Sequence, residues 1–440
     1  MESSARPLVL HLLTRLVVGG PTRPVLTSLD ALGRRGFQPL LVCGKAGPHE
    51  EEAIASLEGY PELPVLRLDA LIRSPSPGRD LQALAALRET LRRLRPRVVH
   101  THTAKAGALG RLAGRLDGGG PLLVHTFHGH SLSKEASGKL APAWRWIERR
   151  LLRHATDLLL TLSPGQRDEI AGLLGVRPGF PIRVQPLAFD PAACGPAPPW
   201  PPGAFSGSRR RLVFVGRGVR IKGLDHLARA HARLVARSAK QARRLEVVVV
   251  GPVDPSVRAE VEGILGPYGL GPCWQWRGAR PDPLREMARA DGLVLPSRSE
   301  GTPVSILEAL WVGRPVLASA VGGVGELLGC RWEREGPGLW QCRPASPRGL
   351  LLPRADAEAW AAALDAFVDD PGCVPGDPLG RRAFVESVFD PRRLSRDLLE
   401  LYRQAGARGL EAADGGTERP APPPRKSSPG VADQAESPRV

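Results

Sequence analysis

Short apolar runs alternate with amphipathic stretches along most of the chain. In the first half, the apolar runs cover residues 8–13, 39–43, 98–101 and 122–126, and apolar residues recur at helical spacing over 25–35, 81–94 and 109–116. A short apolar run predicts a buried strand, and helical spacing predicts a helix with one buried face. Their regular alternation is typical of βαβ units, so we expect an α/β fold with a parallel sheet covered by helices on both faces.

The alternation stops at residue 189 and starts again at residue 211. The segment between is too rich in Pro and Gly to form a helix or a strand, which indicates an interdomain linker. Beyond it, strands are predicted over 211–216, 245–251, 292–297 and 314–319, and a helix over 224–236. The sequence therefore predicts two Rossmann-like, doubly wound domains, at 1–189 and 211–380, joined by a linker at 190–210.

The last part of the chain divides into a helical and a polar segment. Residues 381–404 carry apolar side chains at near-helical spacing, interrupted by Pro391, so we expect two helices within 381–410. Residues 411–440 contain too few apolar side chains to offset the entropy of ordering, which predicts a disordered tail.

Composition restricts the class of protein. A chain of 440 residues with 42% hydrophobic residues is long enough for two buried cores, which excludes a peptide hormone, a knottin or a wholly disordered protein. The formal net charge of +16 favours anionic partners. Only seven of the basic residues are lysines, however, and Gly and Pro are abundant, so compositional drift toward Arg, Gly and Pro is an equally good explanation.

Cysteine spacing and hydropathy favour a cytoplasmic protein. None of the six cysteines forms a C-x-x-C pair, so free thiols in a reducing compartment are expected. The apolar N-terminal run is interrupted by His11 and Arg15 and lacks a small-residue cleavage pattern, unlike a signal peptide. No apolar run approaches the roughly 20 residues needed to cross a bilayer.

The first candidate site follows the predicted strand that ends near residue 297. In open α/β sheets, ligands bind at the carboxyl ends of strands. Glu300 lies in the loop, Thr302 is the expected N-cap and Pro303 the first helical residue. The exposed amides of such a helix bind an anion such as phosphate. Glu300 and Glu308 would hold different parts of one long ligand; alternatively, this is a capped core helix with an acid near its start.

The second candidate is the glycine-rich loop at 214–224. Arg217 and Lys222 flank glycines, including Gly216, that let the backbone come close to a ligand. A guanidinium and an ammonium together suit a diphosphate. The loop matches neither the dinucleotide fingerprint nor the P-loop, which disfavours NAD or ATP. A basic turn without a ligand is the alternative.

The third candidate is a group of three histidines, His125, His128 and His130, after a predicted strand. They could bind a metal, form hydrogen bonds or act in catalysis in the cleft, or serve packing alone. No acidic residue lies nearby in the sequence to complete a metal site.

Two further strand-to-loop elements contain residues of interest. His102 and Lys105 follow the predicted strand at 98–101, and either contact a ligand or mark a buried strand end and a helix start. Gly19 and Gly20 follow the first strand, where they form either a plain tight turn or a close backbone approach to a ligand.

Together, these motifs resemble the retaining, nucleotide-sugar-dependent glycosyltransferases of family 4, which have the two-domain GT-B architecture. The resemblance covers residues 7 to 405 and implies that the last helix returns to the N-terminal domain across a central cleft. The segments that carry it are 19–20, 98–110, 125–130, 216–217, 221–223, 291–297, 300–308, 314–318 and 321–323.

The resemblance implies a role for each candidate residue. Arg217 and Lys222 would hold the donor diphosphate, and Glu308 the ribose. His128 would line the sugar pocket, and Glu300 would face the donor sugar. The catalytic candidates are thus His128, Arg217, Lys222 and Glu300. The wider set expected to bind the donor is Gly19, Gly20, Gly216, Arg217, Lys222, Glu300, Gly301, Thr302, Pro303, Val304 and Glu308, and the acceptor-side candidates are His102 and Lys105.

The implied reaction is hexosyl transfer from a UDP- or GDP-linked sugar to a glycan or lipid-linked acceptor, in cell-surface polysaccharide or glycolipid synthesis. The anomeric configuration would be retained by same-face attack. The chain contains no D-x-D, so neither a metal nor another cofactor is expected, and no nucleic acid partner is expected either. The alternatives are a nucleotide-sugar epimerase or a sugar phosphorylase on the same architecture, or a catalytically silent binding protein.

A basic and aromatic stretch at 139–160 predicts peripheral contact with an anionic membrane on its cytoplasmic face. Trp144 and Trp146 alternate there with several arginines, a combination suited to a lipid interface. An ordinary amphipathic helix packed on the N-terminal sheet is the alternative, because Leu151 and Leu152 already supply a core face.

Overall fold

The computed structural model describes residues 6–17, 20–47, 52–53, 57, 60–116, 120–129, 132, 141–190, 209–280 and 282–407. Gly19, His130, most of the predicted linker and the predicted tail at 411–440 lie outside the described residues.

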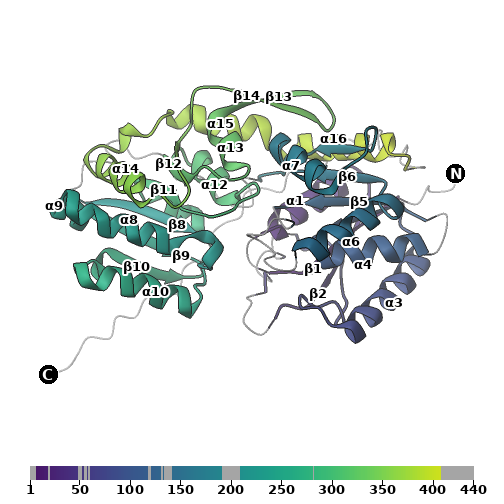
Figure 1. Cartoon of the computed structure of the whole chain (residues 1–440). Helices are drawn as coiled ribbons and strands as arrows, with labels where there is room; N and C mark the ends of the chain where they lie inside the picture. The colour runs from purple at the N-terminus through teal and green to yellow at the C-terminus, as the bar shows by residue number, and fades with distance from the viewer. Residues whose placement is uncertain are drawn as a thin grey trace.

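The N-terminal half forms a parallel sheet of seven strands in the order β3-β2-β1-β4-β5-β6-β7 (Figure 1). The strands are β1 (Leu8–Arg15), β2 (Gln38–Gly44), β3 (Val65–Arg67), β4 (Val98–His102), β5 (Leu122–Phe127), β6 (Leu158–Thr161) and β7 (Ile182–Val184). The helices are α1 (Thr22–Arg34), α3 (Pro77–Leu94), α4 (Ala104–Leu116), α6 (Ala141–His154) and α7 (Pro164–Leu174). Side chains of α3 and α4 pack on one face of the sheet.

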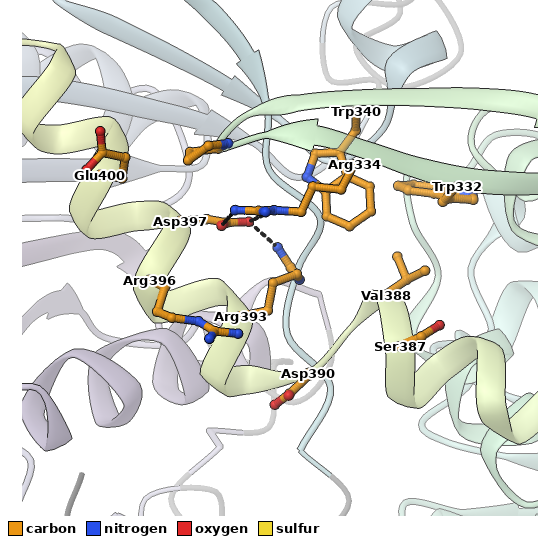
Figure 2. A pocket seen from close by; sticks show the side chains of 11 residues that line it. Trp332, Arg334, Trp340, Ser387, Val388, Asp390, Arg393, Arg396, Asp397 and Glu400 are labelled. Atoms are coloured by element: carbon orange, nitrogen blue, oxygen red, sulfur yellow. Dashed lines mark hydrogen bonds and ion pairs between the residues drawn. The ribbon is translucent and has the colours of Figure 1, made fainter. Parts of the chain in front are cut away.

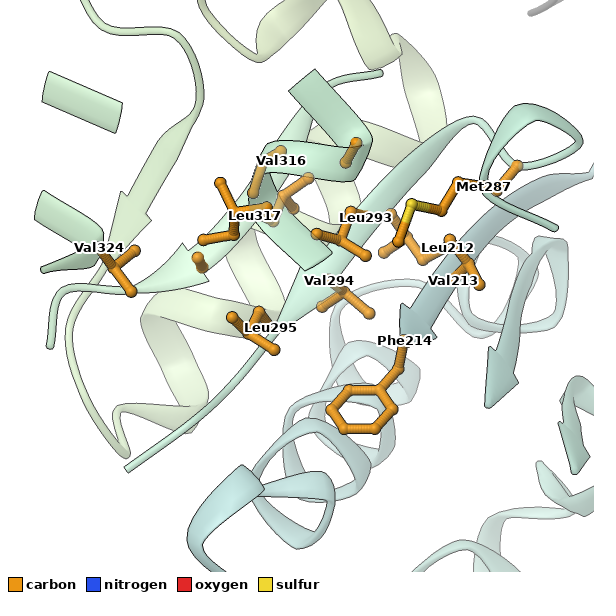
Figure 3. Close-up of a cluster of buried hydrophobic side chains, with 14 of the residues drawn as sticks. Leu212, Val213, Phe214, Met287, Leu293, Val294, Leu295, Val316, Leu317 and Val324 are labelled. Carbon is orange, nitrogen blue, oxygen red and sulfur yellow. The ribbon is translucent and has the colours of Figure 1, made fainter. Parts of the chain in front are cut away.

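The C-terminal half forms a second parallel sheet, in the order β10-β9-β8-β11-β12-β15. Its strands are β8 (Arg210–Val215), β9 (Leu245–Val250), β10 (Trp274–Gly278), β11 (Gly292–Leu295), β12 (Val316–Ser319) and β15 (Leu350–Leu352). Its helices are α8 (Leu224–Arg237), α9 (Ala239–Arg244), α10 (Pro255–Leu265), α11 (Pro283–Ala288), α12 (Val304–Trp311), α13 (Val324–Gly329) and α14 (Ala357–Asp369). Branched aliphatic side chains of β8, β11 and β12 fill the core between strands and helices (Figure 3). The predicted doubly wound α/β fold is confirmed.

A two-stranded hairpin, β13 (Cys330–Gly336) and β14 (Leu339–Pro344), is an addition that the hydrophobic pattern did not lead us to predict. It belongs to the C-terminal half of the chain but extends toward the N-terminal domain (Figure 1). There the backbone N–H of Val184, at the end of β7, donates a hydrogen bond to the carbonyl of Gly338, 3.0 Å away. The hairpin therefore links the two domains.

The last two helices, α15 (Pro378–Val388) and α16 (Pro391–Gln404), pack on different domains. The break at Pro391 is confirmed. Phe384 and Val388 of α15 join the core of the C-terminal domain, whereas Leu398 and Tyr402 of α16 join that of the N-terminal domain. The chain thus returns to the N-terminal domain between the two helices, as Figure 1 shows by the position of α16.

The two segments that cross between the domains touch each other. The backbone N–H of Phe189, just before the linker, donates a hydrogen bond to the carbonyl of Phe389, just before α16, at 2.8 Å. We expect any rotation of one domain against the other to occur around this pair of segments.

A cavity of about 590 Å³ lies between the hairpin and the α15–α16 junction. Figure 2 shows Arg334 of β13 and Arg393 of α16 both directed at the carboxylate of Asp397. None of the predicted site residues lines this cavity. It is a feature of the domain junction and lies apart from the residues described next.

Candidate active site

Lys222 and Glu300 come together at the carboxyl ends of β8 and β11. The ammonium nitrogen of Lys222 lies 2.6 Å from Oε1 of Glu300, which also accepts a hydrogen bond from the Ser297 hydroxyl at 2.6 Å. The backbone at Gly223 makes this approach possible, because its φ is +70° and a Cβ there would lie 2.0 Å from the carbonyl oxygen of Pro296. Only glycine fits so close to the neighbouring loop. The structure therefore brings together two of the predicted catalytic residues.

The Arg217 side chain is exposed on the same loop as Lys222. Within the described part of the chain, it makes no hydrogen bond or ion pair. Gly216, the residue before it, has a φ of +150°, and the turn is held by a hydrogen bond from the N–H of Gly218 to the carbonyl of Pro252. A fixed turn thus presents an unpaired guanidinium, which is suited to an anionic ligand. Arg220, in contrast, pairs with Glu260 at 2.7 Å.

Helix α12 begins one residue later than predicted. Its N-cap is Pro303, which has extended backbone angles, and Val304 is the first helical residue. The expected capping role of Thr302 is therefore wrong: its hydroxyl is buried and has no hydrogen-bond partner among the described residues. Because no side chain caps the helix, the amides of its first turn are available to a ligand.

Glu308 lies on α12 in contact with the other domain. Its carboxylate is buried and accepts a hydrogen bond at 3.0 Å from the guanidinium of Arg23, on α1. Burial raises the pKa of Glu308 to about 7, although the nearby Arg23 charge acts in the opposite direction. In this state, the group expected to hold the ribose is paired with an arginine across the domain boundary.

The loop after β5 meets the loop before α12. A Cβ at Gly301 would lie 2.6 Å from the carbonyl oxygen of His128 and 2.9 Å from the Cα of Gly129. The absence of a side chain at Gly301 therefore lets the domains touch at the predicted sugar pocket. We refer to this meeting of the loop that carries Glu300 and Gly301 with the loop that carries His128 as the interdomain contact.

The histidines lie on two faces of the N-terminal sheet. His128 Nε2 is 2.8 Å from His102 Nδ1, whereas His125 Nδ1 is 2.9 Å from the hydroxyl of Thr101. Consecutive residues of a strand point to opposite faces, so His125 and His128 do not share a site. Burial lowers the pKa of His128 to about 4, which keeps its ring neutral.

The two acceptor-side candidates are both engaged within the N-terminal domain. His102 is buried beneath His128. The ammonium of Lys105 is buried between α3 and α4, where it pairs with Asp80 at 2.6 Å and with the carbonyl of Ser74. Their contact with an acceptor stays a prediction.

Among the glycines of the first turn, Gly20 is described and Gly19 is not. Gly20 has a φ of +61° just before α1, and a Cβ there would meet no atom within 4 Å. The turn thus requires the backbone freedom of glycine and leaves open space next to it.

Two residues of the site were not predicted. Arg23 occupies the second position of α1, and His11 lies inside the predicted first strand. Both act through contacts with residues at least 91 positions away in the chain. The sequence gives only one local signal for each residue. Arg23 is a cation one turn after a glycine pair, and His11 is a histidine inside an apolar strand.

Two family models and several known proteins match the chain. Residues 19–188 match the model of the glycosyl transferase 4-like domain, and residues 209–370 match that of the glycosyl transferases group 1. The chain is 27% identical to a D-inositol 3-phosphate glycosyltransferase of Kineococcus radiotolerans, covering 88% of this chain and 91% of the relative. It is 30% identical to the protein of the same description from Kribbella flavida, covering 70% and 71%.

A second kind of relative and a solved structure extend the comparison. The chain is 26% identical to the UDP-Gal:alpha-D-GlcNAc-diphosphoundecaprenol alpha-1,3-galactosyltransferase of Escherichia coli, covering 72% of this chain and 80% of the relative. The fold is similar to that of sucrose-phosphate synthase from Thermosynechococcus elongatus, with a TM-score of 0.71, 22% identity, and coverage of 91% of this chain and 99% of that one. The chain belongs to the family 4 glycosyltransferases and has the GT-B fold.

Proposed function

We propose that this glycosyltransferase transfers a hexose, with retention of configuration, from a UDP- or GDP-linked sugar to a glycan or lipid-linked acceptor. The observation that carries the proposal is the position of Arg217 and Lys222 in one glycine-rich turn after β8, with Glu300 2.6 Å from Lys222. Such a site matches a ligand that carries a diphosphate next to several hydroxyl groups.

The two cations would neutralise the diphosphate as it leaves. Arg217 has no partner to give up within the described residues, and the Lys222 ammonium has only to turn from Glu300 to the phosphate. The free amides at the start of α12 add further hydrogen-bond donors for the same charge. Charge developing on the leaving nucleotide would then be stabilised without a divalent cation.

The acids would hold the two sugars of the donor. Glu308 accepts hydrogen bonds from the ribose hydroxyls once its contact with Arg23 opens, and Glu300, released from Lys222, accepts them from the donor hexose. His128 approaches that hexose from the other domain. Same-face attack by the acceptor hydroxyl, without a covalent enzyme intermediate, is the mechanism we propose for retention.

Helix α6 supports an acceptor that is held at a membrane. None of the described helices combines the length and apolar character needed to cross a bilayer. On α6, however, Trp146 is 60% exposed, and the guanidinium of Arg150 lies 5.5 Å from the centre of its ring. We propose peripheral contact with anionic lipid on the cytoplasmic face, which would suit a lipid-linked acceptor such as the one named for the Escherichia coli relative.

Substitution of the two cations tests the proposal. We expect Lys222→Ala and Arg217→Ala each to lower kcat/KM for sugar transfer by well over tenfold, because each removes about 2 to 4 kcal/mol of transition-state stabilisation. Arg220→Ala is the matched control: it removes a cation from the same loop, but one that pairs with Glu260 on the surface, so activity should remain near wild type. Near-normal turnover in both test variants would refute the assignment.

Ligand screening separates the remaining alternatives. A ligand that binds only the folded protein raises the midpoint of thermal unfolding, so a screen of nucleoside diphosphates and their sugars would name the donor. Interconversion of a nucleotide sugar without acceptor would identify an epimerase instead. Nucleotide binding with neither transfer nor hydrolysis would identify a silent binding protein.

A further inference from the structure

Four imidazole rings lie side by side in the N-terminal domain. His11 of β1 lies opposite His100 of β4 in the parallel register, so both point to the same face of the sheet, as does His102 two residues further along. His128 follows β5 and completes the group. Neighbouring rings have centroid separations of 4.3 to 5.0 Å.

Three of these rings form a hydrogen-bonded column. His128 Nε2 is 2.8 Å from His102 Nδ1, and His102 Nε2 is 3.0 Å from His11 Nδ1. At the far end, Nε2 of His11 is buried and has no partner among the described residues. His100 stays outside the column, because its nitrogens bond instead to the hydroxyl groups of Tyr402 and Thr126.

The number of N–H groups on the three rings makes their tautomers depend on one another. Burial holds the pKa of His11 at about 3, that of His128 at about 4 and that of His102 well below its usual value, so each ring is neutral and has one N–H. His102 has two neighbours but one hydrogen, so it donates to one and accepts from the other. Both hydrogen bonds of the column therefore point in the same direction.

Only two arrangements satisfy this condition. If every ring carries its hydrogen on Nδ1, His128 can donate a hydrogen bond from Nδ1. If every ring carries it on Nε2, Nδ1 of His128 is an acceptor. A mixture would place two hydrogens, or two lone pairs, against each other inside the protein.

We propose that His102 and His11 are positioning residues that couple the tautomer of His128 to their own, so that all three rings share one tautomer and this shared tautomer sets whether His128 donates to or accepts from a hydroxyl of the donor sugar. The sugar contact rests on the proposed function, whereas the shared tautomer does not. His102 and His11 would thus influence recognition of the donor sugar without touching that sugar.

A metal ion is the competing explanation for this cluster. His11, His100 and His102 each offer a nitrogen, all within 4.8 Å of one another. Binding through all three would require His102 to give up a hydrogen bond to His11 or His128, and His100 one to Tyr402 or Thr126. The existing hydrogen bonds favour the column.

Two conservative variants of His102 provide the test. In His102→Asn, the amide takes the place of Nδ1 and keeps the hydrogen bond to His128; in His102→Gln, it takes the place of Nε2 and reaches only His11. Nitrogen-15 NMR of the unliganded full chain reports the tautomer of each histidine. We expect one shared tautomer for His11, His102 and His128 in the wild type. We expect the tautomer of His128 to be retained in the Asn variant and mixed in the Gln variant.

Kinetics complete the test. We expect the KM for the nucleotide sugar to stay near wild type in His102→Asn and to rise on the order of tenfold in His102→Gln, with equal unfolding midpoints. His125→Asn, on the other face of the sheet, is the control and should leave the His128 tautomer unchanged. Different tautomers in the wild-type column, or equal spectra for the Asn and Gln variants, would overturn the proposal.

The remaining outcomes distinguish the alternatives. Stoichiometric binding of Zn²⁺ that shifts the resonances of His11, His100 and His102 would overturn the column in favour of a metal site. The expected NMR result without a change in KM would support the column and refute the contact between His128 and the donor sugar.

Discussion

The carboxyl group of Glu308 is subject to two opposed influences. Burial favours its protonated form, and the Arg23 guanidinium at 3.0 Å favours its charged form. Burial is the stronger influence, so the group titrates near neutral pH. A small change around Glu308, such as ligand entry or loss of the contact with Arg23, therefore changes the charge of its carboxyl group.

Glu308 should contribute mainly to nucleotide affinity. We expect Glu308→Ala to weaken nucleoside diphosphate binding by roughly ten- to a hundredfold, because hydrogen bonds to a charged group contribute about 1.5 to 3 kcal/mol. Titration calorimetry measures this. The control is Glu326→Ala, which removes another carboxylate that reaches across the domains, to the N–H of Gly165 at 2.8 Å, but lies outside the proposed site. Equal affinity in both variants would contradict the ribose role.

The same group predicts a dependence of stability on pH. Between its ordinary pKa of 4.5 and its value of about 7 in the folded protein, Glu308 binds a proton more tightly when folded. Its contribution to the free energy of unfolding therefore falls as the pH rises through this window. Buried histidines such as His11 act in the opposite direction, because their pKa is lowered on folding.

Denaturant unfolding from pH 4.5 to 7.5 isolates this contribution. We expect the stability of the wild type relative to Glu308→Gln to decrease with rising pH across the range, because the histidine contributions cancel in the difference. A difference that is constant or increases with pH would show that the Glu308 pKa is not raised.

At the scale of elements, the hydrophobic pattern was enough to locate most strands and helices and the break at Pro391. It did not lead us to the β13–β14 hairpin, although alternating residues around Trp332 and Trp340 and a Pro-Gly turn were present. We did not recognise the hairpin because the sequence around it follows the pattern of βαβ units. Thr302 was predicted as an N-cap from residue type alone, but the cap is set by the backbone angles that Pro303 adopts against the domain core.

The candidate site could be predicted only in part, because some of its contacts join residues that are far apart in the sequence. Arg217, Lys222 and Glu300, which lie in loops after strands, were found because parallel strands end at one edge, and Glu308 was found on the helix that follows one of these loops. The ion pair with Arg23 and the histidine column depend on contacts across domains or strands, and local sequence spacing does not encode these contacts.

Helix α6 carries the membrane prediction. We expect the protein to sediment with vesicles that contain anionic phospholipid at low salt. The double substitution Trp146→Ala and Arg150→Ala should lower the bound fraction several-fold, because it removes an aromatic anchor and a cation together. The control replaces exposed Leu81 of α3 by Ala, since it lies on a different helix of the same domain. Absence of sedimentation for the wild type would leave α6 as an ordinary packed helix.

At the scale of the whole molecule, the crossing of α16 predicts how truncation acts. We expect deletion of residues 380–440 to abolish transfer and cooperative unfolding, because it removes α16 from the core that Leu398 and Tyr402 complete. Deletion of 411–440 should change neither, because this segment contains too few apolar side chains to offset the entropy of ordering. Circular dichroism melting and a transfer assay measure both. Equal damage from the two deletions would place structural contacts in the tail.

The position of α16 also determines the order in which the protein can be completed during synthesis. Its apolar side chains cover a face of the N-terminal sheet that includes Val9, Val98 and Val124, yet the ribosome makes α16 about 200 residues after β7. Synthesis adds roughly 5 to 20 residues per second, so this face stays exposed for about 10 to 40 s before α16 can pack on it. We therefore expect the nascent N-terminal domain to expose an apolar face that chaperones can bind, and the domain that leaves the ribosome first to be completed last.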